Sequence, residues 1–116
     1  MTTTNKFRSE VEVTLADQTF TARLSLDGIV RVETALQRSI IQVAQRLSAT
    51  EMTVGELIVI LYQGIKGGGN DVDEKKIKDL ISEAGLITAM AVAGEIVVAA
   101  IGVGDDEGKG LGTESE

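Results

Sequence analysis

Few side chains in this sequence could act as catalytic groups or as metal ligands. The chain has no histidine and no cysteine, so it lacks the commonest general base, the thiolate nucleophile and the usual zinc, copper and haem ligands. Catalysis would have to use carboxylates, lysines, hydroxyls or the single tyrosine, Tyr62. We therefore expect a protein that is not an enzyme and that holds neither a cofactor nor a metal.

The glycine run Gly67–Gly69 is a candidate phosphate-binding loop, and the acidic residues after it are a candidate calcium loop. A Walker loop needs G-x-x-x-x-G-K-[ST] after a strand, whereas these glycines follow a predicted helix and precede Asn70 and Asp71. Counted from Asp71, an EF-hand needs glycine at the sixth position and glutamate at the twelfth, where this chain has Lys76 and Ser82. We interpret both segments as the left-handed end of one helix and the cap of the next.

The last apolar segment, Leu86 to Ile101, has a carboxylate near its middle. Only Thr88, Gly94 and Glu95 interrupt its aliphatic residues. A membrane span needs about 20 apolar residues, so this segment is too short and we expect no membrane contact. We predict a central helix that is buried inside the domain and partly by a partner. A charge in such a helix is costly unless it is paired, so Glu95 should pair with a lysine or arginine, lie at an exposed edge or contact a partner. We expect an ion pair or an interface group.

The positions of apolar residues predict the elements that carry these groups. Residues 7–26 alternate with period two and predict a β-hairpin whose turn is made by Ala16, Asp17 and Gln18. A lone hairpin is marginal in water, so helices or another chain should cover it. Residues 27–102 show helical spacing and predict four to five short helices. The fold class is therefore α+β, with one domain over residues 1–102.

Start signals place the predicted helices along residues 27–102. Val54, Leu57, Ile58, Leu61 and Ile65 share one face of the third helix. The predicted caps are Asp27, the capping boxes Ser39 with Gln42 and Thr53 with Glu56, and Asp73 before a helix that ends near Glu83. Gly85 should separate that helix from the last one. These signals are local and therefore predict boundaries rather than packing.

Charge and composition limit the partners that this chain can bind. The formal net charge is −7, which disfavours nucleic acid because affinity for phosphate backbones comes from cationic side chains. Residues 103–116 are acidic and rich in glycine and predict a disordered tail. Without cysteine or an apolar amino-terminal run, the expected location is the cytoplasm.

Several short strings, taken in order, resemble the small tail-assembly family of tailed bacteriophages and bacterial gene transfer agents. They are LSLDG at 24–28, VETAL at 32–36, TVGEL at 53–57 and LYQGIKGGG at 61–69, followed by the alanine-rich last helix. The resemblance covers about residues 7–101 and implies a chaperone that binds the tape-measure protein without chemistry. It also leaves a structural role as a tail tube component open. A small cytoplasmic adaptor protein unrelated to phage tails is the remaining alternative.

We predict a partner-binding surface on the helix after Thr53 and on part of the last helix. An apolar groove can receive an amphipathic helix through anchors at i, i+3 and i+4. The predicted surface comprises Val59, Ile60, Tyr62, Met90, Glu95 and Val97. Its partner would be the tape-measure protein or tail tube subunits, and a homo-oligomer is possible. The alternative is that both apolar faces are buried in the monomer.

Overall fold

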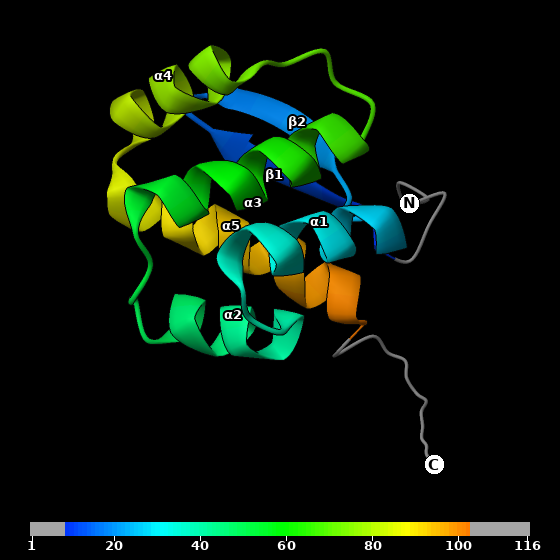
Figure 1. The fold of residues 1–116 in the computed structure, drawn as a ribbon. Coiled ribbons are helices and arrows are strands. Elements are labelled where there is room, and N and C mark those ends of the chain that lie inside the picture. Colours follow the sequence, from blue (N-terminus) through cyan, green and yellow to red (C-terminus); the bar gives the residue numbers. More distant parts are fainter. Residues whose placement is uncertain (1–8, 103–116) are drawn as a thin grey trace.

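The computed structural model describes residues 9–102, which form an N-terminal β-hairpin and five helices (Figure 1). This confirms the predicted α+β class. The elements are β1 (Val11–Leu15), β2 (Gln18–Ala22), α1 (Leu26–Leu36), α2 (Ile40–Ser48), α3 (Val54–Gly67), α4 (Glu74–Ala84) and α5 (Leu86–Ile101). The predicted disordered tail, 103–116, and the predicted start of the hairpin at Phe7 lie outside the described residues.

The hairpin is shorter than predicted and its turn has two residues rather than three. Leu15 pairs with Gln18, so Gln18 belongs to β2. Ala16 and Asp17 have φ angles of 53° and 64°, as a type I′ turn requires. Strand β2 ends at Ala22 because the next amide, that of Arg23, donates a 2.8 Å hydrogen bond to the Gly64 carbonyl in α3.

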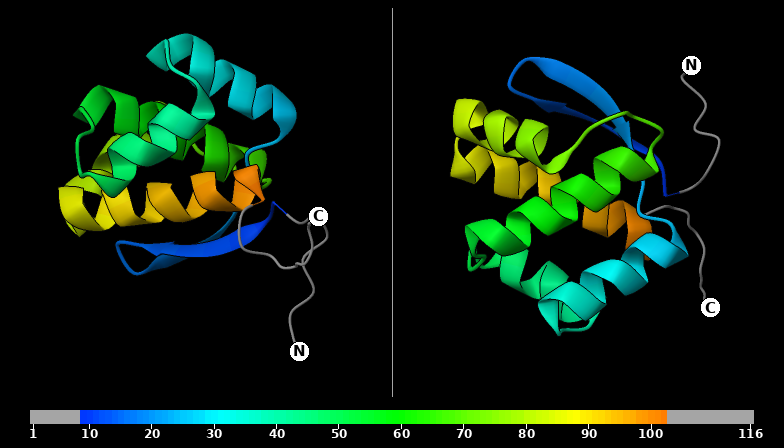
Figure 2. Two further views of the ribbon diagram at one scale, coloured as in Figure 1. Left: turned by 90° about the horizontal axis from the view of Figure 1, so that it is seen from below. Right: turned by 45° about the horizontal axis from the view of Figure 1, so that its top comes forward.

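Helix α5 is the central element of the fold. The hairpin lies along one side of it and the helices α2 and α3 lie along the other, as the left view of Figure 2 shows. The inward face of the hairpin contributes Val13, Leu15 and Ala22 to the core, and Leu24 follows from the link to α1. The helices therefore cover the hairpin, as its marginal stability in isolation predicted.

The local cap signals mostly placed the helix boundaries correctly. Both capping boxes are reciprocal: Ser39 with Gln42 at α2, and Thr53 with Glu56 at α3. Asp73 accepts a 2.8 Å hydrogen bond from the Lys76 amide at the start of α4. Helix α1 is the exception. It begins after Ser25, whose hydroxyl accepts from the Gly28 amide, and Asp27 lies in its first turn.

The glycine run ends α3 in a way that the sequence did not predict. Gly67 is helical, Gly68 has φ −82°, and only Gly69 has a positive φ, 102°. A Cβ atom on Gly67 would collide with the Arg23 carbonyl oxygen, and one on Gly68 with that of Thr21. The first two glycines therefore allow the helix end to approach the β2 backbone closely, and only the third supplies left-handed geometry.

Asn70 completes this joint between α3 and the hairpin. Its side-chain amide donates to the Thr21 carbonyl at 2.7 Å and to the Ile65 carbonyl at 2.8 Å. The first bond uses the outer edge of β2, and the second satisfies a carbonyl in the last turn of α3. The GGGN string is thus explained by packing, and no phosphate site is needed to account for it.

Candidate partner-binding groove

One side of α5 is exposed although the helix is apolar all round. Ala89, Val92, Ala93, Ile96 and Val97 face the core. On the other side, Ile87 is 70% exposed and Val98 is 46% exposed. An isolated exposed aliphatic side chain is common, but several along one helix are typical of an interaction surface.

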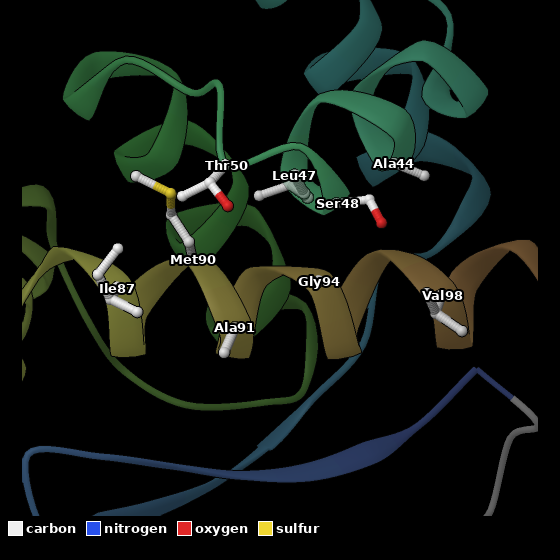
Figure 3. A pocket seen from close by; sticks show the side chains of 9 residues that line it. All are labelled: Ala44, Leu47, Ser48, Thr50, Ile87, Met90, Ala91, Gly94 and Val98. Carbon is white, nitrogen blue, oxygen red and sulfur yellow. The ribbon is translucent and has the colours of Figure 1, made fainter.

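The exposed side of α5 and the neighbouring part of α2 form an apolar groove of about 330 Å³ (Figure 3). We call it the α2–α5 groove. Its lining residues are Ala44, Leu47, Ser48, Thr50, Ile87, Met90, Ala91, Gly94 and Val98. Ser48 and Thr50 contribute the only polar side chains in this lining. Such a surface is suited to binding apolar side chains.

The residues that α5 contributes follow helical spacing along the groove. Ile87, Ala91, Gly94 and Val98 are separated by four, three and four positions, which places them on one helical face. They follow one another along α5 in Figure 3, and α2 lies alongside this helix. The groove is therefore straight and runs along about three turns of α5.

Thr50 gives the wall of the groove an unusual backbone geometry. Its φ is +60°, a left-handed conformation that β-branched residues rarely adopt. The Thr50 amide donates to the Leu47 carbonyl at 3.1 Å, and the Glu51 amide donates to that of Arg46 at 2.8 Å. These two bonds are a Schellman closure of α2, so Thr50 occupies a position where glycine is usual.

Two carboxylates without an ion pair lie next in the chain to lining residues of the groove. Glu51 follows Thr50, and Glu95 follows Gly94; both are exposed, and within residues 9–102 neither makes an ion pair. The expected ion pair of Glu95 is therefore not observed among the described residues. Solvent exposure removes the need for one, because the carboxylate stays hydrated at the helix surface.

Arg46, the basic residue in the last turn of α2, already has an acidic partner. Its guanidinium donates to both carboxylate oxygens of Glu56 at 2.9 Å, and the Thr53 amide donates to the same carboxylate at 3.0 Å. The Arg46 hydrogen bonds lower the pKa of Glu56 below its usual range, although partial burial opposes the shift. This pair joins α2 to the start of α3 and leaves Arg46 with no free charge for the groove.

The structure separates the predicted partner-binding residues into three groups. Ile60 and Val97 are fully buried, so the expectation that they lie on a surface is wrong: α3 and α5 pack against each other and against the hairpin. Met90 lines the α2–α5 groove, and Glu95 borders it. The two remaining residues, Val59 and Tyr62, belong to a different part of the surface.

Val59 and Tyr62 line a second hollow beside α3 and the start of α4. It has a volume of about 340 Å³ and is also lined by Ile58, Gln63 and Glu74. Lys66 caps its tyrosine: the Lys66 ammonium donates to the Tyr62 hydroxyl at 3.3 Å and lies 5.5 Å from the ring centroid. This hollow is more polar than the α2–α5 groove. It shares no lining residue with that groove, so the single predicted surface does not form.

The sequence prediction missed the residues that form the exposed stripe, namely Ile87, Ala91, Gly94 and Val98. Their i, i+4, i+7, i+11 spacing was a usable signal. It was hidden because the rest of α5 is also apolar, so periodicity could not distinguish the inner face from the outer one.

Other kinds of site are not found in the described part of the chain. Within residues 9–102, no three acidic residues are grouped so that they could hold a metal ion. None of the helices in this range has the length and apolar content needed to cross a membrane.

One family of known proteins matches the chain. A family model described as "Phage tail tube protein, GTA-gp10" matches residues 8–102. The chain belongs to this family. The match confirms the resemblance to phage and gene transfer agent tail proteins and covers every helix and strand that the structure describes. No curated protein and no solved structure matched the chain.

Membership in this phage tail tube and gene transfer agent family establishes a tail protein and indicates other tail proteins as partners. The family description names the tail tube, and it does not mention a tape-measure chaperone. The surface of the chain must therefore be used to distinguish a tail tube subunit from a tape-measure chaperone.

Proposed function

We propose that this chain is a non-catalytic tail assembly chaperone that binds the tape-measure protein through the α2–α5 groove in the cytoplasm of the bacterial host. The observation that carries the proposal is the groove itself, an apolar surface with Ile87 70% exposed in a chain of net charge −7. A patch of this kind marks an interaction site. The chain lacks histidine and cysteine, which further supports a binding role over an enzymatic one.

The hairpin favours a chaperone over a tube subunit that polymerises by extending a sheet. A continuous sheet across subunits needs two free strand edges in each subunit. The outer edge of β2 is already occupied: the Arg23 amide bonds to Gly64, and the Thr21 carbonyl accepts from Asn70. Among the described residues the two strands pair only with each other, so the outer edge of β1 is the one left for a strand of another subunit. A tube role remains the second candidate because the family description names it.

Co-expression with the tape-measure protein from the same genome tests the proposal. The chaperone role predicts that the tape-measure protein becomes soluble and co-elutes with this chain in size-exclusion chromatography. The control is the tape-measure protein expressed alone. An insoluble tape-measure protein, together with rings or tubes of this chain alone in electron micrographs, would support the tube role. A monomer that ignores the tape-measure protein and forms no assembly would support an adaptor with another partner.

A further inference from the structure

We infer that the α2–α5 groove accepts an amphipathic α-helix whose apolar stripe is flanked by lysine or arginine. The inference rests on the proposed function only for the identity of the protein that carries this helix. The chemistry of the occupant follows from three properties of the groove: its shape, an unexplained glycine and its border charges.

The shape of the groove suits a helix. Its α5 wall extends from Ile87 to Val98, a length of about 16 Å at the α-helical rise per residue. In Figure 3, α2 with Ala44, Leu47 and Ser48 lies along α5, and Met90 of α5 rises toward Thr50. An occupant helix of about three turns would place residues at i, i+3, i+4 and i+7 between α2 and α5.

Gly94 has no role inside the monomer that would require glycine. It lies in the middle of α5, where glycine weakens a helix relative to alanine. A Cβ on Gly94 would have no atom within 4 Å, whereas a Cβ on Gly64 would lie 2.7 Å from Ile96 Cγ2. Gly64 is thus explained by internal packing and Gly94 is not. A helix that approaches α5 closely at the centre of the groove would explain it.

The carboxylates of Glu51 and Glu95 favour an occupant with positively charged side chains. Glu51 and Glu95 are exposed carboxylates beside groove residues, and the nearby Arg46 is paired with Glu56. A helix with basic residues on both sides of its apolar stripe would meet complementary charge, and an acidic helix would be repelled.

The same charges disfavour two other occupants. Residues 103–116 carry five acidic residues and one lysine, so binding them in the groove would bring like charges to Glu95. A second copy of the chain would bring another Glu95 and a net charge of −7 to the same surface. A basic amphipathic helix from another protein has neither cost.

Two designed peptides test the inference with the full chain. Both have about 18 residues and the same leucine and alanine stripe, so that both can form a helix; one has lysine beside the stripe and the other glutamate. Fluorescence anisotropy should show about tenfold tighter binding of the lysine peptide at low salt. This preference should shrink as salt is added. Equal binding of the two peptides, or no binding of either, would overturn the inference.

Charge variants locate the binding site. The double variant Glu51→Lys, Glu95→Lys should reverse the preference in favour of the glutamate peptide. The double variant Asp71→Lys, Glu83→Lys changes the net charge equally at exposed positions outside the groove lining, and it should retain the lysine preference. If both variants change the preference equally, the effect is one of net charge and the inference fails.

Glycine variants test the contact itself. Gly94→Leu should weaken both peptides about tenfold, because it fills the centre of the groove without an internal clash. Gly55→Leu is the matched control, since a Cβ at Gly55 also has no neighbour within 4 Å. The outcomes separate this inference from the proposed function. A bound lysine peptide without a tape-measure complex retains the inference and removes the proposed function. A tape-measure complex that is indifferent to these variants retains a chaperone role but places its binding site outside the groove, and the inference then fails.

Discussion

Substitution by alanine should change the unfolding free energy in opposite directions at Gly64 in α3 and Gly94 in α5, two glycines within helices. In Gly64→Ala, the new Cβ would lie 2.7 Å from Cγ2 and 3.1 Å from Cδ1 of Ile96, which is fully buried. Overpacking of this kind costs about 1–3 kcal/mol. Replacing a glycine within a helix by alanine stabilises the fold by about 0.5–1 kcal/mol. The net loss of unfolding free energy should lie between about 0 and 2.5 kcal/mol, with a middle value of about 1 kcal/mol.

In Gly94→Ala, only the favourable part remains, because no atom lies within 4 Å of the new Cβ. The unfolding free energy should rise by about 0.5–1 kcal/mol. Urea denaturation followed by far-UV circular dichroism measures both variants against the parent. The melting temperature should shift by about 4 °C per kcal/mol, downwards for Gly64→Ala and upwards for Gly94→Ala.

Two results would refute this reasoning. A Gly64→Ala variant at least as stable as the parent would mean that α3 and α5 do not pack as closely as 2.7 Å implies. A destabilised Gly94→Ala variant would mean that glycine is required at that position by the monomer. The second result would also remove Gly94 from the argument for a partner helix.

Three further predictions test the joint and the ion pair. Gly68→Ala should lower the unfolding free energy by more than about 2 kcal/mol, because its Cβ would collide with the backbone carbonyl of Thr21. Thermal melting measures this loss, and a melting temperature equal to that of the parent would contradict the prediction. Asn70→Asp keeps the size but cannot donate to either carbonyl, so urea denaturation should show a loss of about 1–3 kcal/mol; an unchanged midpoint would mean that the two bonds are dispensable. Glu56→Gln should reduce stability at neutral pH by about 1 kcal/mol or less. Because Arg46 lowers the pKa of Glu56 in the folded state, the carboxylate stabilises the fold above its unfolded pKa of about 4.5, and this contribution disappears as the pH falls through the lowered folded value. Melting temperatures of parent and variant should therefore converge in acid, and a constant difference from neutral to acidic pH would rule the linkage out.

The sequence predicted the elements that depend on local signals. Capping boxes are reciprocal bonds between residues three apart, so Ser39 and Thr53 could be identified without knowledge of the rest of the chain. The alternation of Val13 and Leu15 predicted the buried face of the hairpin for the same reason. Leu26 shows the limit of this argument. It continues the alternation but is 77% exposed, because Ser25 begins a helix before it.

The candidate site depends on packing between distant segments and was predicted only in part. Helices α3 and α5 are apolar on more than one face. Their periodicity therefore could not predict which apolar side chains are buried, and Ile60 and Val97 are fully buried in the structure. The groove requires α2 to lie beside α5, which no local pattern specifies. Met90 was the one groove-lining residue that the sequence identified, and the stripe around Gly94 emerged only from the structure.

A matched pair of surface variants can show whether the tape-measure protein binds in the α2–α5 groove, as proposed above. Val98 in the groove and Val30 on α1 are 46% and 52% exposed, respectively. Glutamate at either position should leave the fold intact, because both side chains are largely solvated. Each variant is co-expressed with the tape-measure protein and analysed by size-exclusion chromatography. Co-elution is expected with the parent and with Val30→Glu but not with Val98→Glu. Equal co-elution of all three chains, or none even with the parent, would mean that the tape-measure protein does not bind in this groove.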